Sequence, residues 1–128
     1  MIMNRIVNVM GLLLLAGQAM ACDEDCNGPV HSTVAEACRL KAEANVLERV
    51  IANRVEGLRV QVGSDTQVGK MLAESQNAWL AYRDAQCQLA AQTQGGTHGI
   101  SWHRCNAEML RERDMLLLEM AAAVAPDS

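Results

Sequence analysis

Two cysteines flank a pair of adjacent glycines in the second half of the chain, and their spacing constrains the fold more than any other feature. Cys87 lies eight residues before Gly95-Gly96, and Cys105 lies nine residues after it. If one helix ends at the glycines and another begins after them, the two helices return antiparallel and equidistant positions face each other. Facing helices have axes about 8–10 Å apart, so inward cysteines can be bridged. We therefore predict a Cys87–Cys105 disulfide that clamps a helical hairpin.

One long helix is predicted for residues 33–62. Apolar side chains recur every three or four positions along this stretch, which is the spacing of one helical face. Thr33 with Glu36 fits a capping box at its start, and Gly63 ends the pattern. The apolar stripe consists of Leu40, Ala44, Leu47, Ile51, Val55, Leu58 and Val62.

Two further helices are predicted on either side of the glycine pair. Ser64 with Gln67 fits the cap of the second helix, which the glycines then end. The third helix is expected to begin near Ser101 and to end before Pro126. The expected buried positions are Val68, Leu72, Trp79, Tyr82 or Arg83, and Leu89 in the second helix, and Met109, Leu110, Leu116, Leu117 and Met120 in the third.

No stretch of the chain shows a sustained period of two, which is the pattern typical of a strand. The content of Ala, Leu, Glu, Arg and Gln favours helix. Three long helices joined by short connections make an antiparallel bundle. The predicted fold class is therefore all-α, a small antiparallel bundle of about three long helices stapled by disulfides.

The first 21 residues have the features of a signal peptide. Arg5 supplies a positive charge, residues 6–16 form a mostly apolar core of eleven residues, and Ala19-Met20-Ala21 fits a cleavage site. The apolar core is too short to span a bilayer. We therefore predict that residues 1–21 are a signal peptide and that the protein is exported.

Cleavage after residue 21 would leave about 107 residues, enough for one compact domain. We divide them into an acidic linker, residues 22–32, and a helical domain, residues 33–125. The cleaved segment holds a single basic side chain, so the remainder has ten Lys and Arg against fifteen Asp and Glu, net −5. This balance argues against nucleic acid as a partner and suits a cationic one.

Export would place the five cysteines in an oxidising compartment, where pairing is the default. An odd count leaves at least one cysteine over. Cys22 stands directly after the predicted cleavage site, where a lipoprotein carries its lipidated cysteine. Two alternatives stay open: Cys22 carries a lipid, or it is free or competes with Cys26 for Cys38. The count favours lipidation, since the other four cysteines then form two pairs.

A set of spaced residues around the glycine pair points to a known family. It consists of Gln76, Trp79, Tyr82, Arg83, Asp84, Cys87, Gly95, Gly96, Cys105, Arg113 and Leu117. This pattern resembles the lysozyme-inhibitor LprI-like family, in its N-terminal domain. The family also tends to open with two cysteines about a dozen residues apart, which correspond here to Cys26 and Cys38. The resemblance therefore implies a second disulfide between these two cysteines and covers residues 26 to 120.

Two features of the chain depart from the family pattern. A Leu-Asn-x-x-Tyr element, common in the first helix of the family, is absent around residues 44–48, and Leu110 stands where a Thr is usual. We interpret both as packing positions. The departures therefore bear on the identity of the ligand more than on the fold.

The motif side chains have a structural interpretation beside a functional one. Trp79 is expected to pack in the core near the disulfide; the alternative is an aromatic contact patch together with Tyr82. For Arg83 and Arg113 we expect ion pairs across the bundle, because a half-buried guanidinium group needs partners. The candidate acceptors are Glu43, Glu48 and Asp84.

The predicted functional loop is the segment 94–102. Its glycines permit unusual backbone angles, and the disulfide would hold the flanking helices. The candidate inhibitory residues are His98, Trp102 and Arg104: Trp102 would pack on a sugar subsite of a lysozyme cleft, and His98 or Arg104 would approach a carboxylate. The alternative is a plain connector.

No metal, cofactor or catalytic activity is predicted. His103 and Cys105, taken with the loop histidine, match no standard metal-ligand spacing, and no nucleophile motif or phosphate loop occurs. The resemblance instead implies an exported protein of the periplasm or cell envelope that binds and inhibits lysozyme. The alternative is a non-inhibitory envelope lipoprotein or interaction module with another protein partner. In either case a lipid on Cys22 would be the route to the membrane.

Overall fold

The computed structural model describes Cys26, Gly28, Pro29 and residues 31–126. The elements of this part are α2 (Thr33–Val62), α3 (Gln67–Gln94), a short 3-10 helix η1 (Thr97–Gly99) and α4 (Ile100–Val124). The described residues contain no strand, so the predicted all-α class is confirmed. The predicted signal peptide and Cys22 lie outside the described residues. Across the described part, no helix combines the length and the apolar character needed to cross a membrane.

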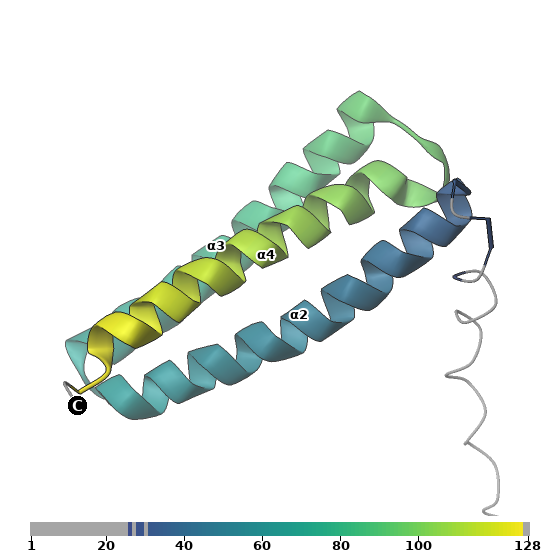
Figure 1. Ribbon diagram of the computed structural model, residues 1–128. Helices are drawn as coiled ribbons and strands as arrows, with labels where there is room; N and C mark the ends of the chain where they lie inside the picture. The colour runs from purple at the N-terminus through teal and green to yellow at the C-terminus, as the bar shows by residue number, and fades with distance from the viewer. Residues whose placement is uncertain (1–25, 27, 30, 127–128) are drawn as a thin grey trace, which may run out of the picture.

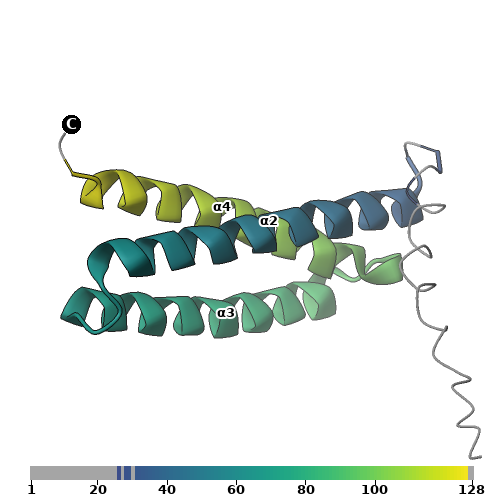
Figure 2. The same cartoon turned by 90° about the horizontal axis from the view of Figure 1, so that it is seen from below.

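The three long helices run up, down and up, with α4 as the helix that packs against both others (Figure 1). α3 is antiparallel to its two neighbours, whereas α2 and α4 run in the same direction (Figure 2). α2 and α3 contact each other much less than either contacts α4. The core therefore follows α4, and its buried members are Ala44, Ile51, Leu58, Leu72, Leu110 and Leu117.

The stripe predicted for α2 is the buried face of that helix. Ala44, Ile51 and Leu58 are buried, and the four other members are half-buried. The helix ends at Gly63, as predicted, and the backbone N–H of this glycine donates to the carbonyl of Arg59. The spacing of apolar residues predicted this buried face correctly because α2 packs against α4 along its length.

The predicted capping box at the start of α2 is wrong by one residue. Ser32 is the N-cap, and its hydroxyl accepts a hydrogen bond from the backbone N–H of Ala35 at 3.4 Å. Thr33 is the first helical residue, which moves Glu36 out of the position that a capping box needs. Glu36 instead forms an ion pair with Arg104 of α4.

The cap predicted at the start of α3 is also wrong. Thr66, not Ser64, is the N-cap; its Oγ1 accepts from the backbone N–H of Gly69 at 3.0 Å. The same hydroxyl donates to the carbonyl of Gly63, 2.6 Å away, so it joins the end of α2 to the start of α3. Sequence spacing pointed to the earlier Ser64 because the turn after Gly63 is longer than expected.

Replacing Thr66 by Ala is expected to lower the free energy of unfolding by about 1 kcal/mol, the usual cost of losing a helix cap. Urea unfolding followed by circular dichroism measures this change. Ser64→Ala is the matched control, because Ser64 is exposed and outside the helix. Equal stability of the two variants would contradict the assignment of the cap.

Several apolar positions predicted to be buried on α3 and α4 are exposed. Val68 and Leu89 of α3 are more than half exposed, and Leu116 of α4 is 47% exposed. Of the two alternatives Tyr82 and Arg83, Tyr82 is exposed, whereas the Arg83 side chain is only 14% exposed, so the prediction holds for Arg83. α3 packs against one neighbour over most of its length, so its buried side is a narrow stripe rather than a broad face. The buried residues of α3 are Gly69, Leu72, Cys87 and Ala90, and those of α4 are Ile100, Ser101, Asn106, Ala107, Leu110, Arg113 and Leu117.

Candidate functional site at the disulfide-bonded end

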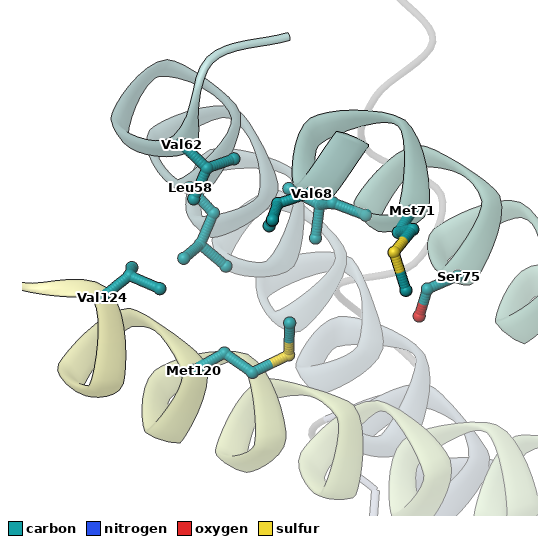
Figure 3. A pocket seen from close by; sticks show the side chains of 8 residues that line it. Leu58, Val62, Val68, Met71, Ser75, Met120 and Val124 are labelled. Carbon is teal, nitrogen blue, oxygen red and sulfur yellow. The ribbon is translucent and has the colours of Figure 1, made fainter. Parts of the chain in front are cut away.

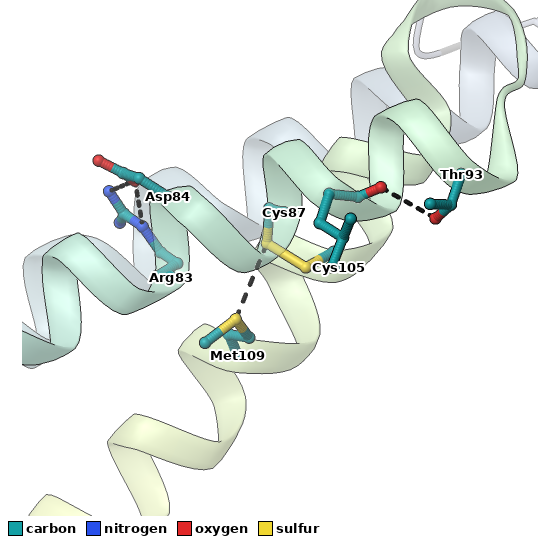
Figure 4. The surroundings of a disulfide bond; sticks show 7 residues. Arg83, Asp84, Cys87, Thr93, Cys105 and Met109 are labelled. Atoms are coloured by element: carbon teal, nitrogen blue, oxygen red, sulfur yellow. Dashed lines mark hydrogen bonds and ion pairs between the residues drawn. A yellow bond between two sulfur atoms is a disulfide. The ribbon is translucent and has the colours of Figure 1, made fainter.

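Two disulfides lie toward one end of the bundle, where α2 and α4 begin and α3 ends. Cys87 pairs with Cys105, with Cα atoms 5.4 Å apart, and Cys26 pairs with Cys38 at 5.1 Å. Both predicted pairs are therefore present. Cys87 has no exposed surface, and the sulfur of Met109 lies 3.8 Å from its Sγ (Figure 4). The first disulfide joins α3 to α4, and the second fastens the segment before α2 to that helix.

The connection between α3 and α4 is a compact turn. Gly95, Gly96 and Gly99 have backbone φ angles of 65°, 101° and 66°. Residues other than glycine rarely adopt such positive φ angles. A Cβ on Gly96 would also lie 2.5 Å from the Cγ2 of Ile100. The buried hydroxyl of Ser101 donates to the Gly95 carbonyl. The glycine pair is therefore needed both for the backbone angles and for close packing.

The candidate inhibitory residues lie mostly on a helix. η1 and the first turns of α4 occupy positions 97–104, so the predicted loop 94–102 is shorter than expected. Trp102 is half-buried, and its ring meets His103 edge-on with centroids 5.5 Å apart. Arg104 is exposed and bonds to Glu36 at 2.7 Å. The backbone of His98 belongs to η1, but its side chain lies outside the described part.

At this end of the bundle, arginines of α4 form ion pairs with glutamates of α2. Arg111 donates two hydrogen bonds to Glu43, at 2.6 and 2.7 Å, and these bonds lower the pKa of Glu43. The hydrogen bond from Arg104 to Glu36 raises the pKa of Arg104. Burial, with a smaller contribution from the charge of Lys41, lowers the pKa of His103. This shift favours the neutral form of His103.

The motif residues Gln76, Trp79, Arg83 and Arg113 form one cluster where α3 and α4 meet. The guanidinium carbons of Arg83 and Arg113 lie 5.5 and 5.6 Å from the centre of the Trp79 ring, within the range of a cation–π contact. Trp79 also packs against the buried core, which confirms the structural interpretation of this residue. Tyr82 is instead 60% exposed, so the two aromatic rings do not share one environment.

The two motif arginines differ in their partners. Arg83 forms the predicted ion pairs, with Glu48 of α2 at 3.3 Å and with its neighbour Asp84 at 2.9 Å. Figure 4 shows the pair with Asp84. The ion pair predicted for Arg113 is wrong. This side chain is 5% exposed and donates to the side-chain oxygens of Gln76, at 2.9 and 3.1 Å, and of Ser75, at 3.3 Å. Burial lowers its pKa.

The spacing around the disulfide places Arg113 opposite Trp79, although it does not show which side chains accept its hydrogen bonds. Trp79 lies eight residues before Cys87, and Arg113 lies eight residues after Cys105. In an antiparallel hairpin these two positions face each other. The disulfide therefore sets the register that brings Arg113 against the Trp79 ring. Gln76 lies about one helical turn before Trp79 on α3 and is also within reach of Arg113.

No group of three or more His, Cys, Asp or Glu that could hold a metal ion occurs within the part of the chain that the structure describes. The described end of the bundle offers instead a short glycine turn, a half-buried Trp and a paired Arg on a rigid support. These features define a small all-α domain stapled by two disulfides.

The family comparison agrees with this class of protein. A family model described as lysozyme inhibitor LprI matches residues 22–114. The chain belongs to this family, and the matched region contains both disulfides and the Trp79 cluster. Neither the comparison with curated proteins nor the comparison with solved structures gives a match.

Proposed function

We propose that this protein is exported and that it binds and inhibits lysozyme through the disulfide-bonded end of its helical bundle. The observation that carries the proposal is the family match over residues 22–114. The alternative, a non-inhibitory interaction module of the envelope, is an outcome of the experiment below.

The shape of this end supports entry into a sugar-binding cleft. Lysozyme-type glycosidases cleave with two carboxyl groups in an open cleft, so an inhibitor need only occupy it. The tip residues Gln94, Gly95, Gly96 and Thr97 are exposed, and the disulfide holds the helices on both sides. A rigid tip loses little conformational entropy on binding, which favours affinity.

Three side chains are assigned roles in this proposal. Trp102, which is half-buried at the start of α4, packs on a sugar subsite. Arg104 exchanges its exposed partner Glu36 for a carboxylate of the enzyme; the exchange costs little because the existing ion pair is exposed to solvent. His98, whose side chain lies outside the described part, is the alternative group for this contact.

Export and charge support an extracytoplasmic partner. Both disulfides require an oxidising compartment, and the first 21 residues have the features of a signal peptide. The net charge of −5 after cleavage speeds encounter with a basic enzyme through long-range attraction. A lipid on Cys22 would anchor the protein in the envelope beside its target.

The combined replacement Trp102→Ala and His98→Ala is expected to weaken inhibition at least tenfold while the helical content stays unchanged. A cell-wall lysis assay against several lysozyme classes, at low and physiological salt, measures the effect. Tyr82→Ala is the matched control, because Tyr82 is an exposed aromatic about 18 Å along α3 from the tip. Unchanged inhibition by the double variant would overturn the role of the tip. If the folded wild-type protein neither binds nor inhibits any class, the proposed inhibition is wrong and the interaction-module alternative becomes the one to test.

A further inference from the structure

α3 carries an exposed stripe along most of its length. Its members follow one another at alternating steps of three and four residues, and each of them is exposed: Val68, Met71, Ser75, Ala78, Tyr82, Ala85 and Leu89. Six of the seven are apolar, and the four largest are 56–60% exposed. An average step of 3.5 residues is the spacing with which one long helix packs against another. The stripe therefore has the pattern of a helix–helix seam although it is exposed here.

This stripe is separate from the side of α3 that packs in the bundle. Met71 and Leu89 each directly precede a buried residue, Leu72 and Ala90. One position corresponds to a rotation of about 100° around a helix. Because α3 contacts α2 much less than it contacts α4, the stripe stays largely uncovered.

An apolar pocket opens beside the first part of the stripe. It has a volume of about 280 Å³ and lies where α2 ends, α3 begins and α4 ends (Figure 3). The stripe contributes Val68, Met71 and Ser75 to its wall, and the other lining residues are Leu58, Val62, Leu72, Met120 and Val124. A wall of this composition favours an apolar occupant.

A second copy of the chain supplies such an occupant if two α3 helices pack antiparallel about a two-fold axis level with Leu80, the middle of the helix. In a two-fold contact, residue i of one copy meets residue j of the other, and j meets i. Leu89 of each copy then lies level with Met71 of the other, at the mouth of the pocket. The insertion occurs twice, and the two helices overlap along their whole length.

The sizes of the side chains match in this register. Tyr82, the largest member of the stripe, lies level with Ala78 of the other copy, and Ser75 lies level with Ala85. Large side chains facing small ones interdigitate, as in a well-packed core. A parallel pairing in register would instead set the two Tyr82 rings against each other.

The charges of α3 favour the same arrangement. The helix has four charged side chains, none in the stripe: Lys70, Glu74, Arg83 and Asp84. Arg83 and Asp84 pair with each other, and residues 85–94 carry no charge. Antiparallel packing sets Lys70 and Glu74 beside this uncharged half of the other copy. Parallel packing would set each beside its own counterpart, and like charges in contact are unfavourable.

We propose that the α3 stripe is the interface of a homodimer, in which the helices pack antiparallel and Leu89 of each copy inserts beside Met71 into the pocket of the other. The two disulfide-bonded tips then lie at opposite ends of the dimer, and both stay free. Dimerisation does not depend on the proposed lysozyme inhibition, and it gives the protein two tips in one particle.

The first test is sedimentation equilibrium of the oxidised protein over a range of concentrations. We expect a mass that rises with concentration toward twice that of the monomer. Leu89→Glu and Tyr82→Glu should each weaken dimerisation at least tenfold, because a carboxylate is costly in an apolar seam. Val46→Glu adds the same charge at an exposed valine of α2 and should not. A monomer at every concentration, or an equal effect of Val46→Glu, would overturn the proposal.

Cysteine cross-linking tests the register. Ala78→Cys and Tyr82→Cys are made separately in a Cys22→Ser background, mixed and oxidised. We expect the two variants to link to each other faster than either links to itself. Faster linking of the Tyr82→Cys variant to itself would indicate parallel packing and contradict the proposed arrangement.

Methyl NMR of Met71 distinguishes the other possible occupants of the pocket. Dilution should shift this signal in the wild-type protein but not in Leu89→Glu. If deletion of the residues after Val124, or addition of decanoate, shifts it while dilution does not, the pocket holds the chain's own end or a small apolar molecule, and the proposal is wrong. Lysozyme inhibition per chain should be unchanged in Tyr82→Glu, so failure here and failure of the proposed function remain distinguishable.

Discussion

Replacing both Cys87 and Cys105 by Ala is expected to lower the free energy of unfolding by about 3 kcal/mol, which corresponds to a fall in Tm of about 10–20 °C. The disulfide closes a loop with a sequence separation of 18 and limits the freedom of the unfolded chain. It also fixes the register in which Arg113 meets Trp79. Thermal unfolding followed by circular dichroism, with and without a reducing agent, measures the change.

The matched control is the replacement of Cys26 and Cys38 by Ala. This disulfide closes a loop of similar size, with a separation of 12. Its loss should cost less, because Pro29 and His31 within the loop are exposed and the freed segment gains entropy in the folded protein as well. If both variants lose the same stability, or the first loses under 1 kcal/mol, the proposed contribution of the Cys87–Cys105 clamp is wrong.

Trp79→Ala is expected to lower the free energy of unfolding by about 3 kcal/mol, as is usual when a large packed aromatic side chain is truncated. Trp79 packs against the core and lies against two guanidinium groups. Its loss would leave Arg113 buried without the ring that faces it. Urea unfolding measures the change, and Trp79→Phe, which keeps an aromatic face, should recover more than half of the loss.

Two further measurements separate packing from the cation–π contact. Trp102→Ala, at a half-buried tryptophan at the end of the bundle, should cost much less than Trp79→Ala. A double-mutant cycle between Trp79→Ala and Arg113→Met should give a coupling energy of about 1 kcal/mol, in the range found for residues in contact. A coupling near zero would show that the ring contributes through packing alone.

The local sequence features that predict this structure correctly are those on which a single structural constraint acts. The glycine pair and the two flanking cysteines predicted the hairpin and its disulfide, because few other arrangements satisfy both the turn and the bridge. The stripe of α2 was predicted because this helix has one well-defined buried side, against α4. Both helix caps were misplaced, since neighbouring Ser and Thr residues are equally able to cap and the exact turn decides between them.

The sequence alone determined the fold class, the helix order and the disulfide register of this protein, because periodicity, glycine breaks and cysteine spacing act locally or through one turn. Tertiary structure decided which apolar residues of α3 are exposed, since that depends on how little α2 contacts α3. It also decided that Arg113 is held by Gln76 and Ser75 rather than by a carboxylate. The apolar pocket likewise arises only where the ends of three helices meet, and no single helix predicts it.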